Sequence, residues 1–497
     1  MNKNLLTGGN GLLKDIRENI LFFLLFALLG VALIVTTIYN MHSARLVLML
    51  LVLGTAIISV VFSSTKIAVM ILLFLGFVGH SIIQFGAPEK FIYLWDLVLL
   101  LLVLKSMSFK LLSGKPIVIT GLMPVIGLCL VTFLSKAVNN TPIVNMCFFL
   151  RYMLSGYLIF FSLMNLKLNN DESRDILRFI VVLFLIQLPV SVIKLILFGQ
   201  GEQSVGTFGF SPGELGVLVP LVAISFMIGF LIYTPGWKKR YIFLILGFIG
   251  FSLIAEKRAF IFFLPMNIAV IYFLSKSSWV EKIKYLTLSI PVFMIIGFGV
   301  VKLNPTLNPT HQIGGTFDPA YIYNYVKSYV NTYDKYGNSS GRFASTIRTI
   351  ENLKSSPVFF LLGDGPGTFI NSGFIGADMS VSKFKYRIED GVTGFVWVAL
   401  QIGVLGFGFL LLFILQLLVK IRRVYMKTSS NFLQIYGLGL LGAGFVFLLD
   451  ICIYSKAYLA GRNLSLVFFV LTAIYLKYGR GELRTKQMIN SGEYVSH

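Results

Sequence analysis

The chain has 497 residues, of which 56% are hydrophobic and only 13% are charged. Because about a quarter of the residues in a soluble domain are charged, this composition excludes an ordinary soluble protein and indicates a polytopic membrane protein. The net charge of +21 would also suit a nucleic-acid-binding protein, but its distribution among the loops explains it better, and we expect no nucleic-acid partner.

Apolar runs recur along the whole chain, and most are long enough to form a helix of about 20 residues that crosses a bilayer. An open sheet could not satisfy its edge groups in lipid, so we expect an all-α fold. We predict fourteen spans, at residues 20–39, 44–62, 67–84, 91–104, 117–134, 143–164, 179–198, 214–233, 241–256, 259–275, 285–301, 391–419, 432–451 and 463–476.

The basic residues predict which way the chain crosses the membrane. With fourteen spans both termini lie on one side, and the loops on that side hold 24 of the 42 Lys and Arg residues. Cytoplasmic loops are enriched in these residues. We therefore predict cytoplasmic termini and interpret most of the positive charge as an orientation signal.

Residues 302–390 form the longest polar stretch, and the predicted topology places it outside the cell. It separates eleven spans in residues 1–301 from three spans and a cytoplasmic tail in residues 391–497. A connection of this length is usually functional or partly folded. We expect helices over residues 320–336 and 342–353, followed by a glycine-rich turn with the sequence "GDGPG".

The second of these expected helices is amphipathic. Its apolar residues share one face because they are spaced by three or four positions: Phe343, Ile347, Ile350 and Leu353. Arg342 and Arg348 lie off that face, towards water or a ligand. The tyrosines of residues 320–336 either stack on sugar rings or pack the loop onto the membrane interface.

Ionisable residues within predicted spans are costly and usually functional. Arg151 is either an anion site that opens outward or a structural arginine that snorkels or pairs with carbonyl groups. Lys257 and Arg258 either form an elbow in the outer leaflet or belong to an ordinary external turn with Glu256 as the local counter-ion. Asp96 and Asp450 are expected to join helices by pairing with basic residues. Arginines at the outer face favour a diphosphate ligand, because the guanidinium fork matches phosphate oxygens.

Three features of the sequence resemble the O-antigen polymerase and O-antigen ligase superfamily (Wzy and WaaL). The segment "GTFGFSPGELGVLVPL" (206–221) resembles the family's G-x-F-x-x-P-N-x-L-G, with Gly213 in place of Asn. The segment "AEKRAFIFFLP" (255–265) resembles an S-R-G-type segment, and Arg258 matches its arginine. "GRF…GDGPGTF" with "ALQIGVLGFGFLLL" (399–412) resembles R…G-x-G-x-x-F…G-x-x-G around the large external loop.

One departure from the family pattern selects between its branches. The ligase branch carries a histidine near the end of the large loop, before the G-x-x-G pair. Here Gly403 and Gly406 match that pair, but residues 387–394 read "RIEDGVTG" and contain no histidine. The resemblance therefore favours a polymerase-type member.

The resemblance implies a GT-C-like membrane fold and an inverting glycosyl transfer that needs no metal or other cofactor. The reaction would take place at the outer face of the bacterial plasma membrane and build a surface polysaccharide. Donor and acceptor would both be glycans on undecaprenyl diphosphate, surrounded by membrane lipids, and control of chain length would need a protein partner. The residues expected to bind the diphosphate are Arg151, Arg258 and Arg342, supported by Lys257 and Arg348.

A general base near the acceptor hydroxyl would assist this reaction by about 10²–10⁴-fold. Glu389 and Asp390 are the best-placed carboxylates in the sequence, and Asp364 is the next. These three residues either act as the base or simply keep the end of the loop solvated.

Two other functions fit a protein of this kind. A flippase of lipid-linked oligosaccharides would also have many spans and a basic cavity, but such transporters are usually built from two similar halves. The loop of 89 residues at 302–390 breaks that symmetry and favours an enzyme. A ligase that moves glycan to a lipid or protein acceptor is the third possibility, and the missing histidine counts against it.

Overall fold

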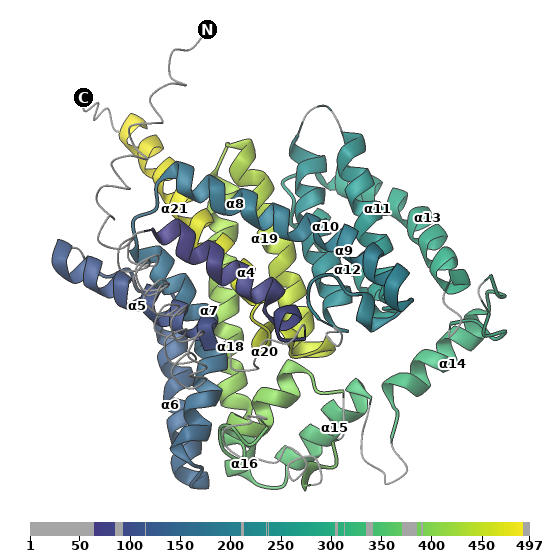
Figure 1. Ribbon diagram of the computed structural model, residues 1–497, viewed down its shortest axis with the longest axis horizontal. Helices are drawn as coiled ribbons and strands as arrows, with labels where there is room; N and C mark the ends of the chain where they lie inside the picture. The colour runs from purple at the N-terminus through teal and green to yellow at the C-terminus, as the bar shows by residue number, and fades with distance from the viewer. Residues whose placement is uncertain are drawn as a thin grey trace, which may run out of the picture.

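The computed structural model describes residues 64–84, 93–114, 116–209, 213–234, 236, 238–303, 307–312, 314–333, 341–369, 385–388 and 391–490. All elements of regular secondary structure in these ranges are helices, as expected from the sequence (Figure 1). The first half contains α4 (Thr65–Gln84), α5 (Tyr93–Ser113), α6 (Leu122–Asn139), α7 (Ile143–Asn165), α8 (Asn170–Leu185), α9 (Gln187–Phe198), the 3₁₀ helix η3 (Glu202–Ser204), α10 (Leu215–Tyr233) and α11 (Lys238–Ile254). The second half contains α12 (Ala259–Leu274), α13 (Trp279–Leu303), α14 (Pro319–Val330), α15 (Arg342–Leu353), α16 (Pro357–Leu362), α18 (Gly394–Lys427), α19 (Asn431–Leu449), the π-helix η5 (Asp450–Tyr454), α20 (Ala457–Ala460) and α21 (Leu464–Asn490).

Eight helices in the described part of the chain are long and apolar enough to cross a membrane. They cover Thr65–Gln84, Leu122–Asn139, Ile143–Asn165, Asn170–Phe198, Leu215–Tyr233, Gly394–Lys427, Asn431–Tyr454 and Leu464–Glu482. Four further predicted spans fall on α5, α11, α12 and α13, and the predicted spans 20–39 and 44–62 lie outside the described residues. The expectation of an all-helical chain with helices that can cross a membrane is confirmed. The count of fourteen spans stays a prediction.

The centre of the molecule is formed by helices that are apolar on every side. α10 and α19 pack against each other, and α18 and α21 pack against α19 (Figure 1). Most residues of α10 and α19 are buried, because a helix without a polar face is stable only when other apolar groups surround it. At the periphery, α6 exposes a stripe of large apolar side chains that suits contact with lipid: Met123, Ile126, Leu130 and Phe133.

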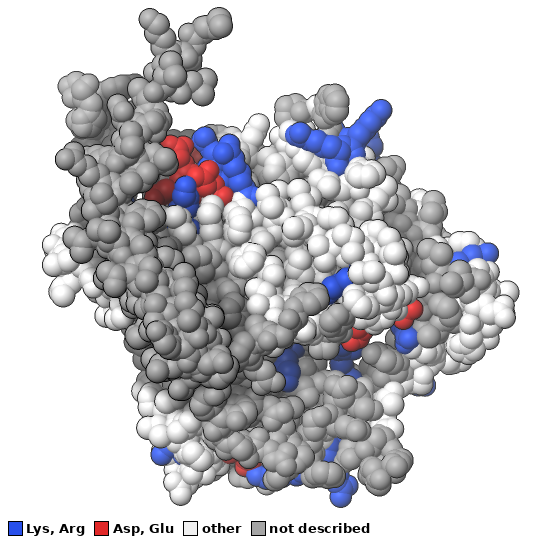
Figure 2. All heavy atoms as spheres, viewed as in Figure 1, with Lys and Arg blue, Asp and Glu red and all other residues white. Residues whose placement is uncertain are grey.

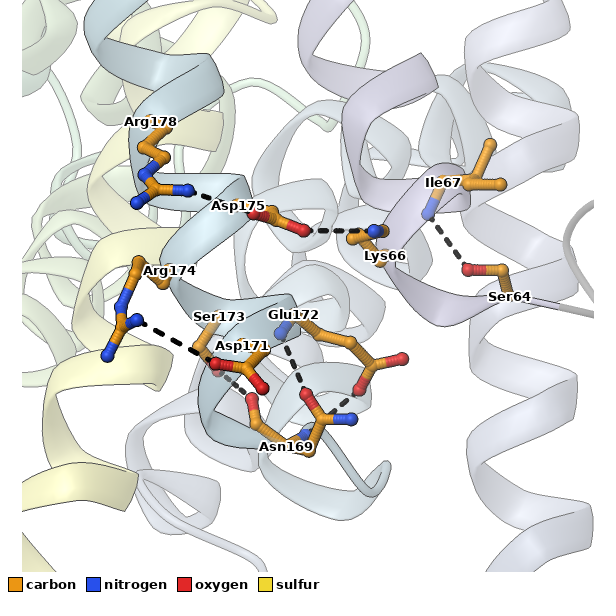
Figure 3. A network of polar contacts seen from close by, with 10 residues as sticks. All are labelled: Ser64, Lys66, Ile67, Asn169, Asp171, Glu172, Ser173, Arg174, Asp175 and Arg178. Carbon is orange, nitrogen blue, oxygen red and sulfur yellow. Dashed lines mark hydrogen bonds and ion pairs between the residues drawn. The ribbon is translucent and has the colours of Figure 1, made fainter. Parts of the chain in front are cut away.

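One end of the bundle carries a network of charged side chains between α4 and α8 (Figure 3). Lys66 Nζ lies 3.0 Å from Asp175 Oδ2 and joins the two helices. The side chain of Asn169 accepts a hydrogen bond from the Glu172 amide, and the Glu172 carboxylate accepts one from the Asn169 amide, which forms a capping box at the start of α8. This is the end that the distribution of basic residues predicts to be cytoplasmic.

The helices α14, α15 and α16 lie at the opposite end of the bundle, called the loop end below (Figure 1). The helix expected at residues 342–353 is confirmed as α15, and the helix expected at 320–336 is α14, which ends at Val330. The buried face of α15 consists of Ala344, Ser345 and Thr349 together with Leu353. The other three residues of the expected apolar face are exposed instead.

Helix α18 is broken near its first third. Ile402 has φ −131° and Gly403 has φ 72°, so residues 394–401 and 404–427 form two helices that meet at a kink. The left-handed conformation at Gly403 is one that glycine adopts without strain. The kink places the first piece of α18 at the loop end, where its N-terminal residue Gly394 donates a hydrogen bond of 2.8 Å to the Ser455 carbonyl.

Candidate functional site

The segment that precedes α10 and the turn between α11 and α12 pack together at the loop end. Lys257 forms an ion pair with Glu202 of η3, and its aliphatic stem lies against Gly216. A Cβ atom at Gly216 would come within 2.8 Å of Lys257 Cγ, so glycine leaves the room that this side chain occupies. The Ser252 hydroxyl donates a hydrogen bond to the Gly216 carbonyl and fixes the two segments together.

Arg258 directly precedes α12 and faces the loop helix α14. Its guanidinium carbon lies 4.9 Å from the centre of the Tyr325 ring, an arrangement that attracts a cation to the ring. Glu256, with φ 54°, makes the turn between α11 and α12. The chain turns here, as both interpretations of Lys257 and Arg258 require, and the choice between them stays a prediction. The carboxylate paired with Lys257 is Glu202 and not the expected Glu256.

Arg342 reaches from the start of α15 to the π-helix η5. Its Nε donates a hydrogen bond of 2.5 Å to the Tyr454 carbonyl, and its guanidinium carbon lies 4.4 Å from the centre of the Tyr454 ring. The arginine thus turns towards the protein, on the side of α15 opposite to the exposed apolar face. π-Helices are rare and often occur at functional sites.

Asp450, at the start of η5, is completely buried and joins η5 to α20. It accepts hydrogen bonds from the Ser455 hydroxyl and, at 2.9 Å, from the Tyr458 amide. Arg342 contacts the same π-helix at Tyr454. Asp450 was expected to pair with a basic residue, but the hydrogen bonds it accepts here come from a hydroxyl and an amide.

These contacts bring Glu214, Lys257, Arg258 and Arg342 into one region, called the loop-end site below. Gly213 adjoins Lys257 and directly precedes Glu214. The Tyr454 ring, which lies beside the Arg342 guanidinium, also packs against Phe263 of α12, the helix that Arg258 precedes. Figure 2 shows Lys, Arg, Asp and Glu atoms in the recess between the bundle and α14–α16. A mixed cluster with several cations and ordered aromatic rings can hold an anionic ligand through charge-assisted hydrogen bonds.

Arg151 belongs to a second cluster, between α5, α7 and the start of α21. Its Nε and Nη2 atoms lie 2.9 and 2.6 Å from the two carboxylate oxygens of Asp96, and Arg462 Nη2 lies 3.2 Å from the same carboxylate. Tyr93 lies 4.9 Å below the Arg151 guanidinium, and Trp95 lies 5.0 Å below that of Arg462. The expected pairing of Asp96 with a basic residue is confirmed, and the partners are two arginines.

Arg348 and Asp364 are held by neighbouring side chains. Arg348 Nη1 lies 3.0 Å from Glu351 Oε2, and its Nε is buried without a hydrogen-bond partner. Asp364 accepts a hydrogen bond from the Tyr386 hydroxyl, and Lys385 Nζ lies 2.5 Å from it. Burial and the hydrogen bond to Asp364 raise the pKa of Tyr386 far above its usual value, so the phenol stays a donor.

Two of the expected carboxylates cannot be placed. Glu389 and Asp390 lie outside the described residues, between the described residues 385–388 and the start of α18. Their assignment as a catalytic base stays a prediction from the sequence.

The "GDGPG" turn docks into the kink of α18. The amides of Asp364 and Gly365 donate to the carbonyls of Leu400 and Gln401, at 2.8 and 3.0 Å. The Gly367 amide donates to the Gln401 side chain at 2.8 Å, and Asn139 of α6 donates to the Gly363 carbonyl at 3.0 Å. The kink interrupts the helical hydrogen bonds there, and the turn provides these carbonyls with donors.

Several residues of these clusters could not be identified as site residues from the sequence. Arg462 looked like an ordinary basic residue of a short external loop, and Glu202 and Glu214 stood in a glycine-rich segment without a clear partner. Tyr325 and Tyr454 carried no signal that distinguished them from other interfacial aromatic residues. Only the fold places them beside an arginine.

The described part of the chain also contains an apolar pocket. The pocket lies between α8, α10, α11, α19 and α21 and is lined by residues without charge, such as Phe184, Phe226 and Tyr436. Among the residues that the structure describes, no group of three or more His, Cys, Asp or Glu side chains could hold a metal ion.

The sequence was also compared with known proteins. No protein-family model matches the chain, and no curated protein matches it. Its function must therefore be argued from the site itself.

Proposed function

We propose that the chain is a membrane glycosyltransferase that polymerises oligosaccharide repeat units carried on undecaprenyl diphosphate. The observation that supports this most strongly is the way the motif-like segments come together. The segment before α10 packs against the turn at Lys257 and Arg258, and the "GDGPG" turn docks on the kink that contains Gly403. Segments far apart in the sequence thus contribute to one end of the bundle, as a shared site requires.

In the proposed reaction, the bond between the anomeric carbon of the donor glycan and its diphosphate breaks. The diphosphate leaves with the bonding electron pair, and the acceptor hydroxyl forms the new bond to the anomeric carbon from the opposite face. Because a diphosphate is already a good leaving group, the protein must mainly align the reactants and stabilise the developing negative charge. Arg258 and Arg342 would bind the diphosphate, with Lys257 beside them.

The proton of the acceptor hydroxyl must pass to a base. Glu214 lies in the loop-end site, next to Gly213, which adjoins Lys257, and is partly exposed. Asp450 itself is completely buried and holds η5 to α20, and Asp364 is occupied by Lys385 and Tyr386. We therefore add Glu214 to Glu389 and Asp390 as a candidate base.

The proposed function also includes an orientation and a place in the cell. We propose a GT-C-like arrangement of fourteen spans in a bacterial plasma membrane, with both termini in the cytoplasm and the loop end outside. Lipid-linked repeat units would reach the loop-end site from the outer leaflet. The product would be a surface polysaccharide, with a protein partner controlling its length.

A reconstitution experiment tests the proposal. Purified protein in liposomes is supplied with a lipid-linked oligosaccharide repeat unit and no other protein, and the products are separated by size on a gel. Wild type should give a ladder, and Arg258→Ala and Arg342→Ala should each abolish it. Arg174→Ala is the matched control, because Arg174 is an exposed arginine at the opposite end of the bundle, and it should leave the ladder intact.

Other outcomes would point to different functions. Movement of the lipid-linked unit to the other leaflet without a ladder would identify a flippase. Transfer of a single glycan to an added lipid or protein acceptor would identify a ligase. A ladder that persists in both arginine variants would contradict the assignment of the diphosphate site.

A further inference from the structure

We propose that α15 and α16 lie in the headgroup region of the membrane at the loop end, with an apolar surface of both helices inserted among the lipids. This inference concerns an interaction surface of the chain. It depends on the protein being embedded in a membrane but not on its being a polymerase.

The first observation is the exposure of the apolar side of α15. Phe343, Ile347 and Ile350 are 53%, 36% and 39% exposed, whereas the opposite side of the helix is buried against the protein. At 100° per residue these three side chains lie within an arc of about 60°. A helix with one apolar stripe and one polar side is stable in water only if the stripe is covered, and it suits the interface of a bilayer.

The second observation is that α16, which contacts α15, also exposes apolar side chains. Val358, Phe360 and Leu361 are exposed by 40–49%, in a helix of six residues that follows α15 directly. Together the two helices expose six large apolar side chains outside the eight helices that can cross a membrane. An apolar patch of this extent is unusual on a surface that faces only water.

The third observation is that α16 contacts a helix that can cross the membrane. α16 packs against α6 and α18, and Gly363, which follows α16, accepts a hydrogen bond from Asn139 at the end of α6. Next to Asn139, Val138 and Leu134 are 54% and 55% exposed. Exposed apolar groups thus lie at the end of α6, where the chain that follows α16 is bound.

The charged groups are placed as an interfacial helix requires. Lys354, at the end of α15, is exposed and lies on nearly the same side of the helix as Ile347. Its long side chain can therefore reach past the apolar stripe towards lipid phosphates. Arg342 lies on the other side and contacts Tyr454. The stripe would therefore hold the loop-end site at the height of the headgroups, where the polar part of any lipid-linked ligand must lie.

Spin labels on α15 test the inference in the full chain. The three cysteines Cys129, Cys147 and Cys452 are replaced by serine or alanine, and single cysteines are introduced at Phe343, Ile347, Ile350 and Glu351. These positions are exposed, so the label does not disturb a packed core. Accessibility of each label to oxygen, which concentrates in lipid, and to a water-soluble nickel chelate is measured by electron paramagnetic resonance in liposomes.

The inference requires high oxygen and low nickel accessibility at the three apolar positions, with a ratio several-fold higher than at Glu351. Glu351 is the control on the same helix, since its side chain is 57% exposed and lies at the polar edge of the stripe. High accessibility to both reagents at Ile347 would show that the stripe faces water. Low accessibility to both would show that protein covers it, and either result overturns the inference.

Discussion

Replacing Gly363 with alanine should destabilise the protein by about 2–5 kcal/mol. Gly363 has φ 68° and ψ −165°, a combination that is essentially restricted to glycine and costs other residues about 1–3 kcal/mol. An added Cβ atom would lie 2.5 Å from the carbonyl carbon of Gln401 and 2.6 Å from the amide nitrogen of Ile402. These are backbone atoms at the kink of α18, which cannot rotate away as a side chain could.

Relief of this overlap would move the turn away from α18 and weaken the hydrogen bonds that join them. Three such bonds lie next to the change: those from Asp364 to Leu400, from Gly365 to Gln401 and from Asn139 to Gly363. Each contributes about 1 kcal/mol, and partial loss of these bonds together with the backbone strain gives the expected range.

The assay is thermal unfolding of the purified protein in lipid nanodiscs, followed by tryptophan fluorescence. Gly408→Ala is the matched control: it lies on the same helix beyond the kink, and its Cβ would meet no atom within 4 Å. Because alanine favours a helix over glycine by roughly 0.5–1 kcal/mol, Gly408→Ala should unfold at the same or a higher temperature than wild type. Equal unfolding temperatures for Gly363→Ala and Gly408→Ala would refute the reasoning.

Three further changes test the polar contacts by the same thermal unfolding assay. Asp96→Asn should cost about 1–3 kcal/mol, because it leaves Arg151 and Arg462 close together without their shared carboxylate. Gln401→Leu should cost about 1–3 kcal/mol, because it leaves the Gly367 amide buried without an acceptor. Asn169→Ala should cost about 1 kcal/mol, because it removes the capping box of α8, and hydrogen exchange should increase in the first turn of that helix.

Each of these changes has its own control. The double variant Asp96→Asn with Arg151→Met should recover part of the loss, since it removes one of the two like charges; a loss larger than that of the single variant would argue against charge repulsion. Gln434→Leu removes a longer and only partly buried hydrogen bond, from the Gln434 side chain to the Thr428 carbonyl at 3.3 Å, and should be milder than Gln401→Leu. Asn170→Ala changes the neighbouring residue without touching the cap, and an effect as large as that of Asn169→Ala would exclude the capping explanation.

Much of the helical architecture follows from the sequence because the driving forces act locally along the chain. Uninterrupted apolar runs predict the helices that can cross a membrane, and all eight such helices of the structure overlap predicted spans. The proline at residue 357 and the glycines of residues 363–367 also predict where α15 must end and where the chain must turn. These signals depend on backbone geometry and on transfer of side chains into lipid, which neighbours in space change little.

The direction in which a helix faces was harder to predict. Phe343, Ile347 and Ile350 form the expected stripe, but the protein packs on the other side of α15, through Ala344 and Ser345. In a soluble protein the apolar stripe would mark the buried face. Beside a membrane both sides of such a helix can be covered, so periodicity alone does not say which side meets the protein.

The sequence by itself determined that this is an all-helical chain with apolar helices that can cross a membrane, and that Arg151 falls within one of them. Only the tertiary structure decided which groups those arginines meet: Arg151 meets Asp96 across 55 residues of chain, and Arg342 meets Tyr454 across 112. The physical reason is that hydrophobic burial is not directional and fixes helices without specifying partners. Hydrogen bonds and ion pairs depend on the position of each atom, and those positions exist only when the helices, the kink of α18 and the turn at its side are assembled.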